Sequence, residues 1–275
     1  MSTLPQEGTP SPAPAAHQMR QVAESFGGDA ARYDRTRPAY PAALITRIIA
    51  ASPGRDVLDV GCGTGIVARQ FESAGCAVLG VEPDARMAEF ASSTGVRAEV
   101  ATFEAWDAAD RMFDAVVAGT AWHWVDPVAG AAKAAQVLRP GGLLAPFHHV
   151  FQTPPELAGV AAEVYRRLLP DSPFNLRGEH RSGLERYQPL FDKIAGGMRQ
   201  AGRFTQPEQW QFGWERTYSR DEWLDQIPTQ GAFTRLPPEQ LAEVQNAVGA
   251  AIDSMGGSFT MTYTTVAVTA ALQHP

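Results

Sequence analysis

The stretch that decides the fold is Asp56-Val57-Leu58-Asp59-Val60-Gly61-Cys62-Gly63-Thr64-Gly65. A short apolar run leads to an acidic residue, three glycines follow at every second position, and a helical pattern begins at residue 66. This order predicts a buried strand, a tight glycine turn and a helix. Glycines accept backbone angles that side chains forbid, and the free N–H groups at a helix start attract ligands. We therefore expect a ligand-binding turn here.

The spacing of the glycines separates two kinds of cofactor turn. A dinucleotide fold needs the pattern G-x-G-x-x-G, and the position of its third glycine is Ile66 here. The third glycine is Gly65 instead, which gives D-x-G-x-G-x-G. This pattern resembles motif I of the class I S-adenosylmethionine-dependent methyltransferases. The resemblance implies that Asp59 orients the turn and the cofactor's amino group, although a carboxylate that merely caps the turn is an alternative. It also implies cofactor contacts along the turn, at Gly61, Cys62, Gly63, Thr64 and Gly65.

A second acidic position supports the same interpretation. Residues 76–81 predict another buried strand, which ends in Glu82-Pro83-Asp84. An acidic residue about 20 positions after a glycine loop suits ribose recognition, because a carboxylate can accept hydrogen bonds from both vicinal hydroxyls. We therefore predict that Glu82 binds the ribose with Pro83 beside it, and that Asp84 is the N-cap of the next helix. The alternative for Glu82 is the capping role itself.

Further residues are expected around the adenine. Met87 lies at the position where methyltransferases of the subgroup that this chain resembles pack a side chain on the adenine. The alternative is that Met87 is a core residue. Thr102 and Phe103 are predicted adenine contacts, although Ala101 and Phe103 depart from the usual G-x-A-E pattern of the family. Residues 112–119 open with the F-D-x-V pattern of the family's fourth strand. The cofactor contacts expected at and after this strand are Gly119 and Trp122.

A segment before the glycine turn resembles a lid. Residues 26–41 match F-x-x-x-A-x-x-Y-x-x-x-R-P-x-Y-P, the entry segment of a small-molecule subgroup that includes trans-aconitate-type methyltransferases. In that subgroup the segment lies over the cofactor, which implies that Tyr33 and Arg37 face its methionine end. The alternative is a surface helix whose tyrosine packs and whose arginine caps a neighbour.

The acceptor side is expected after the fourth strand, where Trp122-His123-Trp124 leaves the same sheet edge as the glycine turn. Aromatic residues suit a sulfonium cation. His123 is the general-base candidate because its ordinary pKa is near neutrality, and a pocket-lining role is the alternative. His148 and His149 alternate faces of a strand but have no third ligand at recognisable spacing, so we expect no metal. The predicted acceptor pocket contains Tyr33, Trp122, His123, His148 and His149.

Composition limits the partners. The chain has 275 residues, a formal net charge of −7 and no cluster of Lys or Arg, so a nucleic acid is not the expected partner. It shows no signal pattern and no apolar run long enough for a membrane span. Cys62 and Cys76 are the only cysteines, which fits a reducing cytoplasm. The oligomeric state stays open.

The predicted fold is α/β: a Rossmann-like, doubly wound, seven-stranded and mostly parallel sheet with an antiparallel last strand. An N-terminal lid helix and a helical insertion after strand five complete it. The expected parts are a disordered tail (1–16), lid helices (17–52), an S-adenosylmethionine-binding core (53–150), a helical acceptor-binding insertion (151–203) and the C-terminal part of the sheet (204–275).

The predicted function is S-adenosylmethionine-dependent methyl transfer to an O, N or C nucleophile of a small-molecule acceptor, a metabolite or natural product. The second product would be S-adenosyl-L-homocysteine. The alternative is a sensor or partner protein that binds S-adenosyl-L-methionine without transferring the methyl group. The acceptor, the methylated atom and the need for a general base stay open.

Overall fold

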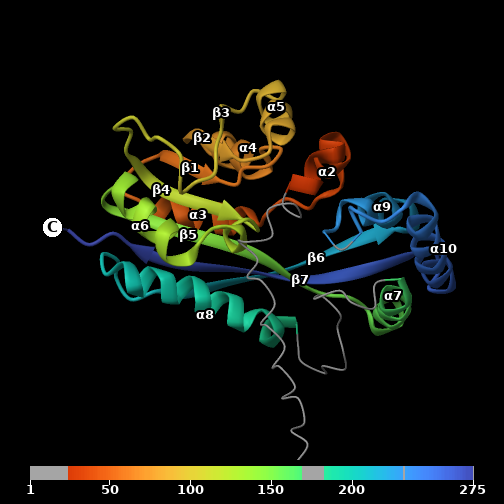
Figure 1. Ribbon diagram of the computed structural model, residues 1–275. Coiled ribbons are helices and arrows are strands. Elements are labelled where there is room, and N and C mark those ends of the chain that lie inside the picture. Colours follow the sequence, from red (N-terminus) through yellow and green to blue (C-terminus); the bar gives the residue numbers. More distant parts are fainter. Residues whose placement is uncertain (1–23, 169–182, 232, 275) are drawn as a thin grey trace, which may run out of the picture.

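The computed structural model describes residues 24–168, 183–231 and 233–274 (Figure 1). The predicted tail of residues 1–16 lies outside these ranges, as do residues 169–182 of the predicted insertion. The described elements are η2 (Glu24–Asp29), α2 (Ala30–Thr36), α3 (Ala42–Ala51), β1 (Asp56–Val60), α4 (Ile66–Ser73), β2 (Ala77–Glu82), α5 (Ala85–Ser93), β3 (Ala98–Val100), β4 (Phe113–Gly119), η3 (Trp122–Trp124), α6 (Pro127–Val137), β5 (Leu138–Gln152), α7 (Pro155–Leu168), α8 (Gly183–Ala201), β6 (Glu208–Ser219), α9 (Arg220–Gln226), η4 (Ile227–Thr229), α10 (Pro238–Ser254) and β7 (Ser258–Ala271).

The sheet has seven strands in the order β3-β2-β1-β4-β5-β7-β6. The pairs from β3 to β5 are parallel, and β7 runs antiparallel to both β5 and β6. This confirms the predicted sheet and its antiparallel last strand. The strand order reverses between β1 and β4, and ligands of open α/β sheets bind at such a point, at the carboxyl ends of the strands.

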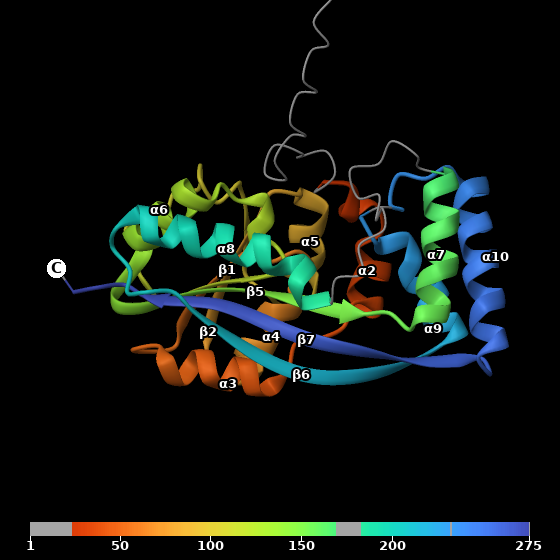
Figure 2. The same ribbon diagram turned by 90° about the horizontal axis from the view of Figure 1, so that it is seen from below.

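Helices cover both faces of the sheet, which explains why the central strands β1 and β4 are apolar on both sides. Figure 2 shows α6 and α8 on one face and α3 on the other. The first face buries Val116 and Leu144 with Phe191 of α8, and the second buries Val117 with Leu44 of α3. Helix α8, in the segment predicted to be an acceptor-binding insertion, therefore forms part of the main core.

A third apolar cluster lies beyond the parallel strands. β6 and β7 are long and continue past β5 to the helices α7, α9 and α10 (Figure 1). Their apolar side chains meet Trp223 of α9 and Ile252 of α10. Inside this cluster the hydroxyl groups of Tyr218 and Tyr263 share a hydrogen bond of 2.7 Å. We call these helices and the strand ends beneath them the C-terminal lobe.

Local signals placed several helix boundaries correctly. Asp84 caps α5 by accepting from the Arg86 N–H, as predicted. Ser219 and Glu222 form the predicted capping box of α9. The sequence predicts a single N-terminal lid helix before α3, but the described chain there is a 3₁₀ turn followed by α2. Gly27 and Gly28 disfavour a regular helix, and Asp29 provides a new cap.

The sixth strand begins later than predicted. A strand from Phe204 is expected from the sequence, but β6 starts at Glu208. Phe204 makes only an isolated bridge to Leu272. Pro207 precedes the strand and has no N–H to donate to a ladder, which explains the late start.

Candidate functional site

The glycine turn lies where β1 ends and α4 begins. Gly61, Gly63 and Gly65 have φ angles of 65°, 56° and 87°, in the left-handed region that favours glycine. A Cβ atom at Gly61 would lie 2.6 Å from the Cβ of Ala121, so the loop after β4 adjoins the turn closely. The structure thus brings together the two loops that the sequence predicts at one edge of the sheet.

Glu82 joins the end of β2 to this turn. Its Oε2 accepts a hydrogen bond of 2.9 Å from the Gly63 N–H, and its Oε1 accepts one of 2.9 Å from the Asp84 N–H. Burial raises the pKa of the Glu82 carboxyl, and the two backbone donors oppose this effect. A carboxylate has about four lone-pair positions, so two of those on Glu82 are free to accept further hydrogen bonds.

Asp59 carries buried oxygens that lack a partner. Its side chain is 0% exposed, and neither carboxylate oxygen has a hydrogen-bond partner among the described residues. Burial raises the pKa of Asp59 to about 8, the nearby charge of Glu82 adds to the rise, and the Ala68 backbone opposes it. A buried carboxylate gains most from a cationic partner. The residues present therefore fit the amino group of an amino acid, which is the methionine end of the expected cofactor.

Helix α2 is held against the turn by Arg69 of α4. One guanidinium nitrogen of Arg69 donates to the Thr64 carbonyl at 2.7 Å, and another donates to Asp34 of α2 at 2.6 Å. Arg37 follows α2 and lies over the ring of Tyr33, with 4.8 Å between guanidinium carbon and ring centre. Arg37 donates to the Thr229 carbonyl, while its buried Nε has no partner among the described residues. Arg69 thus links Asp34 of α2 to the turn, whereas Arg37 contacts Thr229 in η4.

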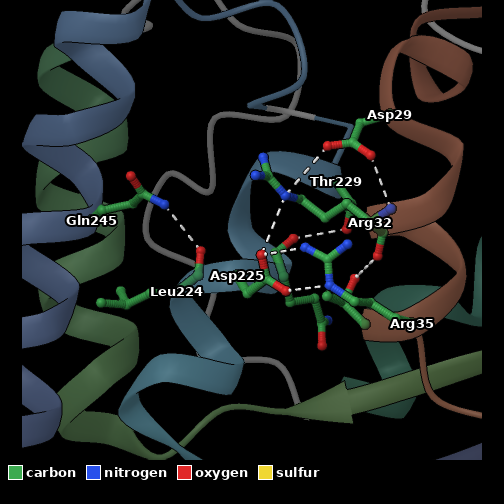
Figure 3. A network of polar contacts seen from close by, with 9 residues as sticks. Asp29, Arg32, Arg35, Leu224, Asp225, Thr229 and Gln245 are labelled. Carbon is green, nitrogen blue, oxygen red and sulfur yellow. Dashed lines mark hydrogen bonds and ion pairs between the residues drawn. The ribbon is translucent and has the colours of Figure 1, made fainter.

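The opposite side of α2 is fixed to the C-terminal lobe (Figure 3). Arg35 makes two hydrogen bonds of 2.9 Å to the carboxylate of Asp225 in α9, and Arg32 lies 3.2 Å from the same carboxylate. Gln245 of α10 donates to the Leu224 carbonyl at 3.0 Å and so ties α9 to α10. The lid therefore bridges the parallel sheet and the C-terminal lobe.

The side chains predicted near the adenine lie against the turn or in the core. Met87 is buried, and its methyl group would lie 3.6 Å from a Cβ atom at Gly63. Phe103 and Trp122 are buried with ring centres 5.9 Å apart. Thr102, Pro83 and Gly119 are half-buried, and Gly119 has no room for a side chain beside Val67. Phe103 and Trp122 are therefore core residues at the back of the site.

The histidines of the predicted acceptor pocket divide between the two faces of the sheet. His123 Nδ1 lies 3.1 Å from His148 Nε2. His149 lies on the other face, where it stacks on Tyr40 with ring centres 4.1 Å apart and shares a hydrogen bond with Thr265. Burial lowers the pKa of His123 to about 4 and that of His149 to about 3, and it lowers the pKa of His148 as well. All three histidines are therefore neutral at pH 7.

Two aromatic residues in the site were not predicted. Phe26 of η2 packs edge-on against Tyr33 at 5.9 Å and against Trp124 at 6.4 Å. Phe26 opens the lid motif, and Trp124 follows His123, so both stood in recognised segments. Phe26 and Trp124 lie about a hundred positions apart, and the sequence alone does not show that they are in contact.

Among the described residues there is neither a group of side chains that could hold a metal ion nor a helix that could span a membrane. No group of three or more His, Cys, Asp or Glu residues among them is arranged to hold a metal ion. Within the same ranges, every helix is too short or too polar to cross a bilayer.

Comparisons with known proteins agree with this geometry. Residues 58–146 match a family model described as a methyltransferase domain. An uncharacterised methyltransferase from Mycobacterium tuberculosis is 38% identical over 127 residues, which cover 46% of this chain and 52% of that protein. A demethylmenaquinone methyltransferase from Tropheryma whipplei is 29% identical over 136 residues, 45% of this chain and 57% of that protein. The chain spans about half the length of the curated relatives it matches.

Solved structures resemble more of the chain. A structure described as a candidate type II methyltransferase from Anaeromyxobacter dehalogenans has a TM-score of 0.62 and 25% identity, and it covers 86% of this chain and 99% of that one. A second, from an antibiotic biosynthesis pathway of Anabaena variabilis, has a TM-score of 0.56 and 14% identity over 84% of this chain and 98% of that one. The second likeness shows the fold alone.

Proposed function

Because residues 58–146 match a family model described as a methyltransferase domain, we propose that the chain is an S-adenosylmethionine-dependent methyltransferase with a small-molecule acceptor. The cofactor would supply a sulfonium methyl group: a lone pair of an acceptor O, N or C atom would bond to the methyl carbon while the C–S bond breaks, its electrons go to sulfur and any proton on the nucleophilic atom passes to water. Binding, orientation and the exclusion of water then fall to the side chains of this chain.

The hydrogen bond between the Gly63 N–H and Glu82 carries the proposal. It holds the Glu82 carboxylate directly at a turn whose left-handed glycines allow close approach of a ligand. In this proposal Glu82 accepts hydrogen bonds from the ribose hydroxyls. The partnerless carboxylate of Asp59 accepts from the amino group, and the guanidinium of Arg37 binds the carboxylate of the methionine end.

The remaining predicted residues would form the walls of the cofactor site. Met87 and Pro83 would lie on one side of the adenine, with Thr102 at its edge. The buried rings of Phe103 and Trp122 would support this wall from behind. Gly119, where a side chain would clash with Val67 and Tyr40, would contact the cofactor through its backbone.

The acceptor would lie between η3, the end of β5 and the lid, within reach of Tyr33 and His123. His148 would form the wall behind His123, and His149, on the other face, would support Tyr40. The family match ends at residue 146, so the elements that complete this side are outside it. Most of the rate would come from holding the nucleophile in line with the sulfonium methyl.

The net charge of −7 makes a metabolite or natural product a more suitable acceptor than a nucleic acid. Two free, buried cysteines suit a cytoplasmic location.

Calorimetric titration of the full chain with S-adenosylmethionine and with S-adenosylhomocysteine tests the proposal. We expect both to bind with a dissociation constant of about 1 μM. Glu82→Gln should weaken binding by about tenfold or more, because a hydrogen bond to a charged group is lost. Glu89→Gln, an exposed change on α5, is the matched control. Absence of binding by the unchanged chain would overturn the enzyme proposal. Unchanged affinity in Glu82→Gln would remove the ribose role alone.

Transfer of a labelled methyl group to a panel of small molecules then separates the enzyme from its alternative. We expect S-adenosylhomocysteine to accumulate with at least one acceptor. Tight cofactor binding without transfer to any acceptor would favour a sensor or partner protein.

A further inference from the structure

We infer that His148 fixes His123 in the tautomer that carries its proton on Nε2, so that His123 donates a hydrogen bond to the acceptor and does not remove its proton. The inference rests on the proposed methyl transfer. It narrows the acceptor to molecules that present an oxygen or nitrogen lone pair beside the nucleophilic atom. His148 is a positioning residue in this arrangement.

The argument begins with the short contact between the two rings. His123 Nδ1 and His148 Nε2 lie 3.1 Å apart, which is a hydrogen-bond distance and requires one proton between the two nitrogens. A neutral imidazole has one N–H group and one lone pair. The ring that accepts at this contact must therefore carry its single proton on its other nitrogen, which is Nε2 for His123 and Nδ1 for His148.

The surroundings of His148 decide between the two arrangements. His148 is 2% exposed, and its Nδ1 has no hydrogen-bond partner among the described residues. The ring of Phe191, also fully buried, packs edge-on against it at 6.5 Å. If His123 donated, His148 would have to carry its own proton on Nδ1, as a buried N–H group without an acceptor. Such orphaned donors are rarer in proteins than orphaned lone pairs.

The other arrangement avoids the orphaned donor. His148 then donates from Nε2 and leaves only a lone pair on the buried Nδ1. His123 accepts this bond at Nδ1, so its single proton is on Nε2. His123 is half-buried, and its ring packs on Trp124 at 4.4 Å, next to Phe26 of the lid. A bound molecule at the end of β4 therefore meets an N–H donor and not a basic lone pair.

Nuclear magnetic resonance of the full chain, labelled with ¹⁵N in its histidines, tests the inference without any acceptor. Correlations between the ring carbon-bound protons and both ring nitrogens distinguish the two tautomers at pH 7. We expect His123 and His148 both to be protonated on Nε2, with signals assigned by their loss in His123→Gln and His148→Leu. Protonation of His123 on Nδ1 would overturn the inference.

A second measurement separates positioning from simple packing. In His148→Leu the donor to His123 Nδ1 is gone, so the Nδ1 signal of His123 should shift and a fraction of its Nδ1–H tautomer should appear. An unchanged tautomer of His123 in this variant would show that His148 does not fix it. Titration with S-adenosylhomocysteine checks that the variant is folded. If the chain failed to bind the cofactor, the proposed function would fall while the tautomer measurement would still be decided.

Discussion

Asp59 holds its carboxylate fully buried and without a partner, and at the scale of single residues it links stability to pH. The carboxyl ionises near pH 3.8 in an unfolded chain but near 8 in the folded protein. Folding therefore takes up a proton between these values, and the contribution of Asp59 to stability is lost as the pH rises through this window. An asparagine at this position does not ionise and would have no such dependence.

We predict that, without cofactor, Asp59→Asn becomes more stable relative to the unchanged chain as the pH rises from 5 to 7. The relative free energy of unfolding should increase by about 1.4 kcal/mol per pH unit. Urea unfolding at several pH values measures it. Asp253→Asn, on the exposed face of α10, is the control and should follow the unchanged chain. Parallel curves for Asp59→Asn would mean that the carboxyl ionises near its ordinary pKa.

His123 allows a test with two nearly isosteric replacements. Gln places an amide N–H near the position of Nε2, whereas Glu places a carboxylate there. If His123 donates, His123→Gln should keep kcat within about tenfold of the unchanged enzyme, and His123→Glu should lose more than about a hundredfold. Initial rates with any acceptor that the unchanged enzyme methylates show whether His123 acts as a donor or as a base. The opposite order of the two variants would identify His123 as a base.

Residue identities predicted local chemistry well and distant contacts poorly. The glycine turn, the cap at Asp84 and the acidic end of β2 follow from spacing over a few positions, and the structure places them as expected. Which histidine of the pair meets His123 could not be predicted. Alternation assigns His148 and His149 to opposite faces, but only the packing of η3 shows which of the two faces His123.

At the scale of secondary-structure elements, the position of α2 depends on ion pairs with α9. Asp225 holds Arg32 and Arg35 together, and all three side chains are partly exposed. Exposed ion pairs contribute little to global stability. Their effect should therefore appear in the local opening of the lid and not in the unfolding of the whole chain.

We predict that Asp225→Asn speeds amide hydrogen exchange in residues 30–36 by roughly two- to fivefold. Exchange in α4 should not change, since Arg69 still contacts the glycine turn. Asp253→Asn removes a comparable exposed pair with Arg220, far from α2, and is the matched control. Equal exchange of residues 30–36 in both variants would show that Asp225 does not restrain the lid.

Elements were predicted reliably where one local signal dominates. A capping-box pattern at Ser219 and a proline at position 41 are both signals of a helix start, and α9 and α3 begin one residue after them. The docking of α2 on α9 depends on partners about 190 positions apart, and no local pattern encodes such a distance.

At the scale of the whole molecule, the C-terminal lobe and the main core share the strands β6 and β7. Each strand is buried in the lobe at one end and in the sheet at the other, as with Met261 and Val268 of β7. Both strands were predicted from the sequence, but their packing in the C-terminal lobe was not. A run of β-branched residues does not show how far a strand extends beyond the neighbouring strands of the sheet.

We predict that Ile252→Ala lowers the free energy of unfolding of the entire chain by about 2–5 kcal/mol, through loss of a fully buried side chain. Because the shared strands couple the two parts, near-ultraviolet and far-ultraviolet circular dichroism should report the same single transition. Asn246→Ala, an exposed change on the same helix, should leave the midpoint almost unchanged. Two separate transitions would show that the lobe unfolds independently.

The strand order also has a consequence for protein synthesis. β7 is the last strand to leave the ribosome, yet it lies between β5 and β6 and pairs with both along most of its length. Until residues 258–271 emerge, β5 has one open edge and β6 has no neighbour in the sheet. The glycine turn can form early, but the edges of β5 and β6 stay unpaired in the nascent chain until β7 is made. During that time both strands are exposed to chaperones and to other chains.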